Sequence, residues 1–199
     1  MFGKSSKALT LIGAVHLPPL PGAADYRGSI DEIIEVAMLD GLEYKKQGFD
    51  ALIVENTHDV PYLKGYVAPE TTASMSVIAR QMKREIELPL GVQLLAGANI
   101  EALAAAIAAS LEFIRVEGFV YAHIGDEGIH EACAAELVRK RFNLGASAVM
   151  ICADIKKKHS SHAITSDMSI AETAINAEIF KADAVIVSGM RTGDAPCLA

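Results

Sequence analysis

The chain has 199 residues, of which 51% are hydrophobic and 22% are charged, and its formal net charge is −7 at pH 7. This length suits one large hydrophobic core and is short for two, so we expect a single domain over residues 1–199. The negative charge disfavours nonspecific binding to nucleic acid or to anionic membranes as the main activity. No stretch approaches the ~20 consecutive apolar residues that a membrane-spanning helix needs.

The cysteines are odd in number and lack the spacing of a metal or redox motif. Cys133, Cys152 and Cys197 form no CxxC pair. Reduced thiols in a cytosol-like compartment are the simplest interpretation. The sequence therefore predicts a cytoplasmic protein.

Strand and helix signals alternate along the chain. Apolar runs predict strands at 9–16, 50–56, 89–95, 113–117, 148–155 and 184–188. Helices are predicted after the capping boxes at Ser29 and Ser169, around 75–86, from Asn99, and from Asp126 with Ile129, Cys133 and Leu137 in register. Such β–α units, linked by right-handed crossovers, form a parallel sheet covered by helices.

The fifth predicted strand shows how its two faces differ. Side chains alternate along a strand, and the odd positions from 149 to 155 are all apolar. The even positions become polar toward the end of the strand, where Asp154 and Lys156 stand. Charged side chains at the end of a buried strand are costly to desolvate unless they form an ion pair or act on a ligand. A structural ion pair is therefore the alternative to a functional role.

Polar residues gather on the equivalent face of several strands, and this distribution separates two architectures. An open doubly wound sheet has helices on both faces, and no G-x-G-x-x-G motif follows the first strand. A barrel has an interior that opens at the C-terminal ends of the strands, where barrel enzymes place catalytic groups. We therefore predict an α/β fold of the TIM (β/α)8-barrel type. With six predicted strands, the barrel is expected to be truncated after the sixth and to lack the last two β/α units.

The predicted mouth of this barrel collects acids, cations and an imidazole. Such a mixture shifts pKa values in both directions and can supply a general base and a stabiliser of developing charge. The residues predicted to act in catalysis are Asp154, Lys156, Glu55, Glu117 and His16. The residues predicted to bind the ligand are Arg115, Gln93, Asn56, Asp126, Lys158, His159 and Ser188. An ion network that only fills the upper layer of the barrel is the alternative.

Two further features concern ligands. Lys156, Lys158 and His159 stand close together in a loop, and cations and imidazoles suit a phosphate oxyanion. His58 with Asp59 and His123 with Asp126 invite a metal interpretation, but they lie on separate loops without HxH or HExxH spacing. No metal site is predicted, no cofactor is identified, and His130 is expected on the surface of a helix.

Five segments of the chain resemble the BtpA family. They are GAVHLPPLPG at 13–22, IVENTHDVPY at 53–62, FIRVEGFVYAHIGDEG at 113–128, ADIKKKHSSH at 153–162 and AVIVSGMRTG at 184–193. The resemblance implies a TIM barrel of the ribulose-phosphate-binding type and, in photosynthetic organisms, a role in photosystem I biogenesis. It also implies two more β/α units after the last motif, where phosphate-binding barrels usually grip the phosphate.

Two functions remain open at this point. The first is an enzyme that acts on a small phosphorylated metabolite by acid–base chemistry at the mouth. The second is a non-catalytic assembly or stability factor that uses the barrel as a binding surface, because one fold hosts many functions. Unpaired outer strands also lead us to expect a self-associating chain, a homo-oligomer.

Overall fold

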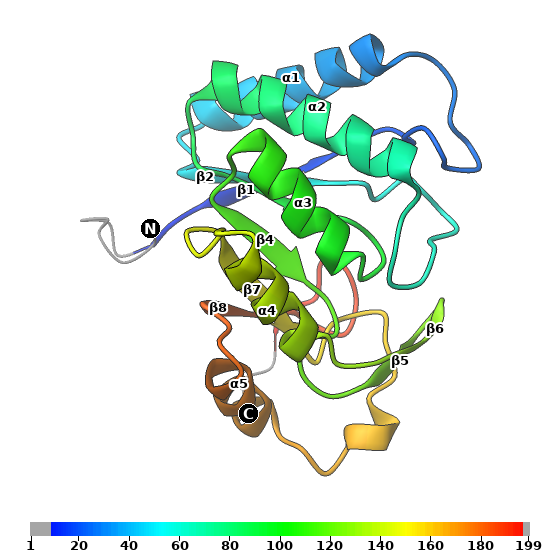
Figure 1. Cartoon of the computed structure of the whole chain (residues 1–199), viewed down its shortest axis with the longest axis vertical. Coiled ribbons are helices and arrows are strands. Elements are labelled where there is room, and N and C mark those ends of the chain that lie inside the picture. Colours follow the sequence, from blue (N-terminus) through cyan, green and yellow to red (C-terminus); the bar gives the residue numbers. More distant parts are fainter. Residues whose placement is uncertain (1–8, 197–199) are drawn as a thin grey trace.

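The computed structural model describes residues 9–196 and contains a curled, fully parallel six-stranded sheet (Figure 1). The strands pair in the order β1-β2-β3-β4-β7-β8, so neighbours in the sheet follow the chain. Their bounds are β1 Ile12–His16, β2 Ala51–Glu55, β3 Leu90–Gln93, β4 Phe113–Val116, β7 Met150–Ile155 and β8 Ala184–Val187. All six predicted strands are confirmed, within a few residues at their ends. Cys197 lies outside the described residues.

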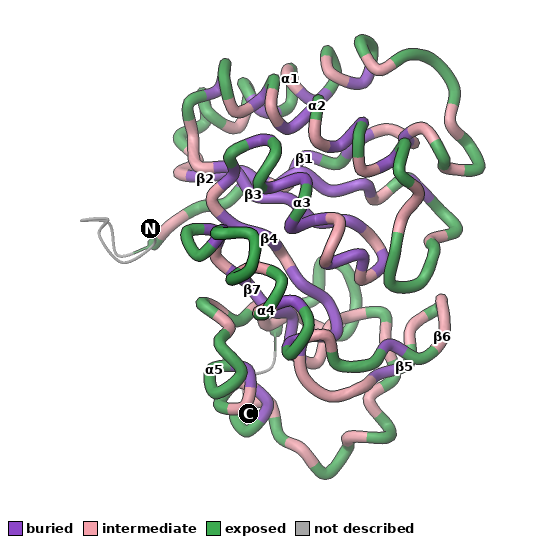
Figure 2. The backbone as a smooth tube through the Cα atoms, viewed as in Figure 1, coloured by how far each residue is buried: buried purple, intermediate pink, exposed green. Residues whose placement is uncertain are grey.

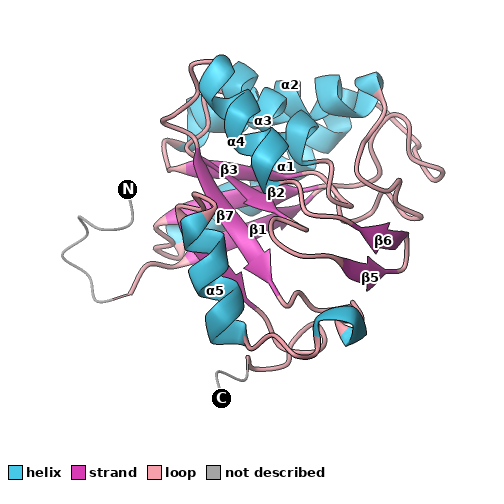
Figure 3. Ribbon diagram, turned by 60° about the horizontal axis from the view of Figure 1, so that its bottom comes forward, coloured by secondary structure: helices cyan, strands magenta, loops and turns pink. Residues whose placement is uncertain are grey.

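Helices connect successive strands and lie on one side of the sheet (Figure 3). They are α1 Ile30–Lys46, α2 Pro69–Ile86, α3 Asn99–Ala109, α4 Ala134–Asn143 and α5 Ile170–Ile179, with a short 3-10 helix, η1, at Ala163–Thr165. Both predicted capping boxes are present. Ser29 and Ser169 each accept a hydrogen bond from the backbone N–H three residues later, and the glutamate there bonds back to the serine N–H. Each box satisfies two N–H groups that the first helical turn leaves free.

The region 123–133 differs from the prediction of a helix that begins at Asp126. It contains an antiparallel hairpin of β5, His123–Gly125, and β6, Gly128–His130, and α4 begins only at Ala134. Gly128 has φ +108°, a left-handed value that suits glycine and breaks a helix. Ile129 and Leu137, whose spacing suggested one helix, therefore belong to β6 and to α4. His130, expected on a helix surface, is buried on the inner side of the hairpin.

The two faces of the sheet carry different cores. The larger core joins strand residues such as Val15, Val54 and Ile151 to helix residues such as Ile78 and Leu103, and the burial of the strands is visible in Figure 2. The smaller core belongs to the opposite, concave face and has Ile53, Phe113 and Cys152 at its centre. The alternation predicted for β7 is confirmed, because Ile151 and Ala153 lie in the larger core and Cys152 lies in the smaller one.

The fold is thus an α/β half-barrel with one helix-covered face and one concave face. Among the described strands, β1 and β8 each have a neighbour on one side only. No helix among residues 9–196 is long and apolar enough to cross a membrane.

One glycine shows how tightly the concave face is filled. A Cβ atom at Gly91 would overlap the ring of Phe113, which packs over the neighbouring strand. We predict that Gly91→Ala lowers the free energy of unfolding by about 1–3 kcal/mol, the usual cost of overpacking. Urea denaturation measures this loss.

The double change Gly91→Ala with Phe113→Leu provides the control. Because the smaller side chain leaves room for the new methyl group, the double variant should lose less stability than the two single variants added together. Strict additivity would contradict the predicted overlap.

Candidate functional site

The parallel register brings the polar ends of the strands to one level. His16 is paired with Glu55, and Glu55 with Gln93, at the C-terminal ends of β1, β2 and β3. Arg115 and Asp154 occupy β4 and β7 farther along the sheet. Each of Glu55, Arg115 and Asp154 stands two residues after a member of the smaller core, Ile53, Phe113 or Cys152. Because side chains two residues apart share a face, these polar groups also lie on the concave side.

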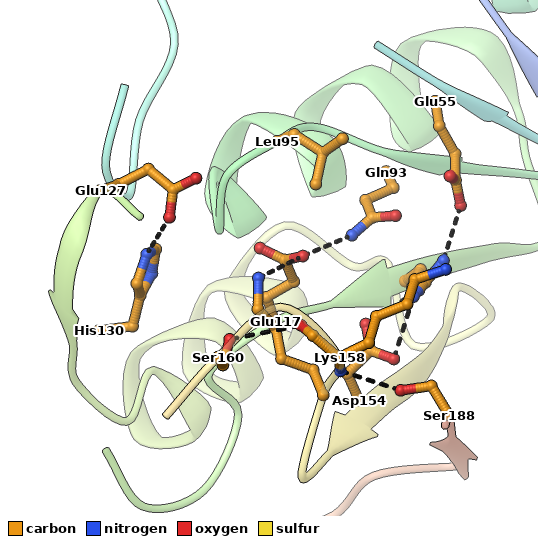
Figure 4. Close-up of polar contacts among 12 residues, drawn as sticks. Glu55, Gln93, Leu95, Glu117, Glu127, His130, Asp154, Lys158, Ser160 and Ser188 are labelled. Carbon is orange, nitrogen blue, oxygen red and sulfur yellow. Dashed lines mark hydrogen bonds and ion pairs between the residues drawn. The ribbon is translucent and has the colours of Figure 1, made fainter. Parts of the chain in front are cut away.

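Arg115 ties β2, β4 and β7 together, and Figure 4 labels the two acids that it binds, Glu55 and Asp154. Its Nε and Nη2 donate to both carboxylate oxygens of Asp154, at 2.9 and 3.2 Å, and its Nη1 donates to Glu55 Oε1 at 3.0 Å. The Asp154 side chain is completely buried and that of Glu55 is 6% exposed. Glu55 and Asp154 therefore lie on the same face, as the barrel interpretation requires.

The electrostatics of this triad follow from its burial. Burial raises the pKa of Asp154, and the adjacent guanidinium opposes that rise. For Arg115, burial disfavours the charge, but the two carboxylates outweigh it and raise the pKa of the guanidinium. The triad is a charged network whose members stabilise one another in a low-dielectric setting.

A second polar group lies beside the triad, around Glu117. Gln93 Nε2 donates to Glu117 Oε1 at 3.2 Å, and Lys157 Nζ donates to the same oxygen at 3.0 Å. Gln93, at the end of β3, and Glu117, just after β4, point toward one another in Figure 4. Glu117 is buried, and the Lys157 side chain is 11% exposed.

These groups border a cavity of about 430 Å³, which is within the range of small-molecule sites. The sequence-predicted residues that line it are His16, Glu55, Gln93, Arg115, Glu117, Asp126, Lys158 and His159. Lining residues that the sequence did not single out include Lys157, Thr57, Tyr62, Glu127 and Thr192. Asp126 and Glu127 lie in the turn between β5 and β6, where the sequence predicted the start of a helix.

Four predicted residues do not line this cavity. Asp154 is held by Arg115 and borders a separate small pocket, and Ser188 Oγ accepts a hydrogen bond from the Lys158 backbone N–H at 3.0 Å. Asn56 is buried and joins two loops, because it donates to Asp59 and accepts from the backbone N–H of Leu95. The fourth residue is Lys156.

Lys156 does not continue the alternation of β7, which corrects the sequence prediction. The strand ends at Ile155, and Lys156 adopts φ +47°, so the chain turns there. Its ammonium donates to the backbone oxygen of Thr165 at 2.6 Å and to the Thr165 hydroxyl at 3.2 Å. Lys157 takes the place beside the acids that we expected for Lys156.

Two histidines of the β5–β6 hairpin, His123 and His130, meet His162 from the loop before η1. The rings of His123 and His130 stack with centroids 5.0 Å apart, and the ring of His162 lies 5.6 Å from that of His123. His130 Nε2 bonds to Glu127 at 3.2 Å, and His162 Nε2 to the Lys157 backbone oxygen at 3.0 Å. Burial, followed by the charge of Lys157, lowers the pKa of His123 to about 4.

The metal interpretation gains no support from this cluster. Within residues 9–196, no group of three or more His, Cys, Asp or Glu side chains is arranged to hold a metal ion. His58, the other histidine considered, bonds through Nδ1 to the Leu17 backbone oxygen at 2.7 Å and anchors a loop. What the cavity offers is hydrogen-bonding and acid–base chemistry from carboxylates, ammonium groups and imidazoles.

Comparison with known proteins places this chain among uncharacterised relatives. Residues 7–199 match the sequence profile of the BtpA family. A Caenorhabditis elegans protein named as uncharacterised and mitochondrial is 44% identical, over 98% of this chain and 72% of its own length. An uncharacterised Pyrococcus horikoshii protein is also 44% identical, over 92% and 69%. The Synechocystis protein named photosystem I biogenesis protein BtpA is 35% identical, over 94% and 65%.

The first prediction from this site concerns Arg115. Arg115→Met leaves Glu55 and Asp154 buried without their cation, so we expect the free energy of unfolding to fall by about 3–5 kcal/mol. Lys45→Met is the matched control, because Lys45 and Glu87 form an exposed pair whose loss should cost less than about 1 kcal/mol. Equal losses in chemical denaturation would show that the triad contributes no more than a surface ion pair.

The second prediction concerns His123 and pH. An unfolded histidine takes up its proton near pH 6.5, whereas the folded His123 resists protonation down to about pH 4. Between these values the unfolded state binds more protons, so stability should fall as pH falls, by roughly 3 kcal/mol from this group, since each unit of pKa difference is worth about 1.4 kcal/mol.

Unfolding curves at several pH values measure the effect. His123→Gln should flatten the loss of stability between pH 6.5 and 4, whereas His159→Gln, at an exposed position, should not. A wild-type slope retained in His123→Gln would exclude His123 as its source.

Proposed function

The chain belongs to the BtpA family, and from this premise we propose that its mouth cavity binds a small phosphorylated metabolite and supports acid–base chemistry on it. One observation carries the proposal. Lys158 lines the cavity, and its ammonium forms no ion pair with a carboxylate among residues 9–196. An unneutralised cation beside a cavity of this size favours an anionic ligand.

The phosphate is assigned to the rim of the cavity. Lys158, His159 and Thr192 line it together, and His159 Nε2 lies 3.0 Å from the Thr192 hydroxyl. An ammonium, an imidazole and a hydroxyl are suitable partners for phosphate oxygens. Arg115 is less suitable, because Glu55 and Asp154 already neutralise it.

The acid–base groups are assigned to the floor. His16 Nε2 lies 3.6 Å from Glu55 Oε2, and the His16 side chain is half exposed, so this pair can exchange a proton with a ligand. Asp154 acts here by holding Arg115 in place. The catalytic role predicted for Lys156 stays a prediction. The variants below compare its part in ligand binding with that of Lys158.

The architecture is proposed to be that of the first six units of a (β/α)8 barrel forming one domain. The curled parallel sheet and the polar groups at its C-terminal edge support this assignment. The edges of β1 and β8 favour self-association. A cytoplasmic location remains a prediction, and one relative is named as mitochondrial.

A non-catalytic assembly factor is the second candidate. It is favoured by the name of the Synechocystis relative, a photosystem I biogenesis protein. A protein of this kind would present the same mouth as a binding surface and turn nothing over. Ligand binding without any change in the ligand would favour this second function.

The predicted test of the phosphate site uses two neighbouring lysines. Lys158→Met should weaken the binding of ribose 5-phosphate by about 1.5–3 kcal/mol, or roughly tenfold to a hundredfold, the worth of a hydrogen bond to a charged group. Lys156→Met should leave binding nearly unchanged, because the Lys156 ammonium is engaged with Thr165. Titration calorimetry measures both.

Two outcomes would count against this assignment. A larger loss in Lys156→Met than in Lys158→Met would restore the residue that the sequence favoured. Equal binding of ribose and ribose 5-phosphate to the wild-type protein would end the phosphate proposal.

A further inference from the structure

Glu117 has a carboxylate oxygen without a hydrogen-bond donor. Its Oε2 is buried and has no partner among the described residues, whereas Oε1 accepts from both Gln93 and Lys157. Two other buried side-chain atoms in the described part of the chain share this property, Glu101 Oε2 and His123 Nε2. Of the three residues, only Glu117 lines the 430 Å³ cavity.

The other acids of the floor differ from Glu117 in this respect. Asp154 accepts through both of its oxygens from Arg115. Glu55 accepts from Arg115 through Oε1 and has His16 close to Oε2. Three of these four oxygens accept from Arg115, and the fourth, Glu55 Oε2, lies 3.6 Å from the His16 imidazole, so a ligand donor would compete with a group already in place.

A buried carboxylate oxygen without a donor is costly, and an incoming donor removes that cost. Native proteins leave few such groups, and those few are found at catalytic and binding sites or beside a water or ion. Its place beside a cavity large enough for a small metabolite favours a ligand as the missing partner.

We propose that Glu117 Oε2 accepts a hydrogen bond from a hydroxyl group of the ligand and so determines the specificity of the cavity. The inference rests on the proposed function and names its ligand class, a phosphorylated polyhydroxy compound. The phosphate lies at Lys158 and His159, and the hydroxyl-bearing end lies at Glu117. A neutral hydroxyl is favoured over an ammonium, because Lys157 already supplies the Glu117 carboxylate with a positively charged partner.

Ligand entry involves Lys157. Glu117 Oε2 exposes less than 1 Å² in the free protein, so a hydroxyl reaches it only when neighbouring side chains shift. Lys157 is bonded to the same carboxylate by a long, flexible side chain and lines the same cavity as Lys158. Its ammonium can exchange Glu117 for a phosphate oxygen while the carboxylate turns to the ligand.

The experiment compares three probes by titration calorimetry: ribitol 5-phosphate, n-pentyl phosphate and ribitol. The first two share a phosphate and a five-carbon chain and differ in their hydroxyl groups. The wild-type protein should bind ribitol 5-phosphate at least roughly tenfold more tightly than n-pentyl phosphate, the worth of a hydrogen bond to a charged acceptor. Glu117→Gln should reduce this ratio several-fold, because the acceptor becomes neutral.

A second variant guards against misfolding of the first. Glu117→Met with Lys157→Met removes both charges together, so neither is left buried alone, and should bring the ratio to within about twofold of one. Melting curves establish that both variants are folded. A ratio retained in the folded variants would overturn the role of Glu117.

The probes separate this inference from the proposed function. Equal binding of ribitol and ribitol 5-phosphate, with a loss of both in Glu117→Gln, would overturn the phosphate proposal and leave the hydroxyl acceptor standing. Equal binding of the two phosphates to the wild-type protein would overturn the hydroxyl acceptor and leave the phosphate site standing. Absence of binding by all three probes would overturn both.

Discussion

The guanidinium of Arg115 is the group around which the concave face is organised. It reaches from β4 to Glu55 on β2 and to Asp154 on β7, and β3 lies between the first two of these strands. Each charge is buried enough that losing its partner would leave it poorly solvated. A shift of one residue in any of these strands would turn its polar side chain to the helix side, so the triad fits one register only.

This saturated network decides which groups remain free for chemistry. Two of the acids expected at the mouth are engaged by Arg115, and one of them, Asp154, does not line the cavity. The groups with unused capacity are Glu117, through its second oxygen, and Lys158, and both border the cavity. The structural interpretation of the charged residues therefore applies to the Arg115 triad, and the functional interpretation applies to other residues of the same face.

Membership of the BtpA family agrees with this arrangement but leaves the activity open. The relatives reported above include two uncharacterised proteins and one named for photosystem I biogenesis. A fold of this kind supports both catalysis and binding, so the function has to be argued from the cavity. A buried acceptor and an unneutralised cation on one cavity are the observations on which the proposed two-ended ligand rests.

The sequence by itself determined the elements whose signals are local. Capping boxes fixed the starts of α1 and α5, and the alternation of β7 assigned Cys152 and Asp154 to one face, because both depend on neighbouring residues only. Only the tertiary structure decided that Lys157 would replace Lys156, since the turn after Ile155 forms together with contacts to Thr165, nine residues later. The contact of His162 with His123 and the unpartnered oxygen of Glu117 likewise depend on segments that meet only in the folded chain. The hydrogen-bond partners of these side chains are distant in the sequence, so no local sequence pattern predicts them.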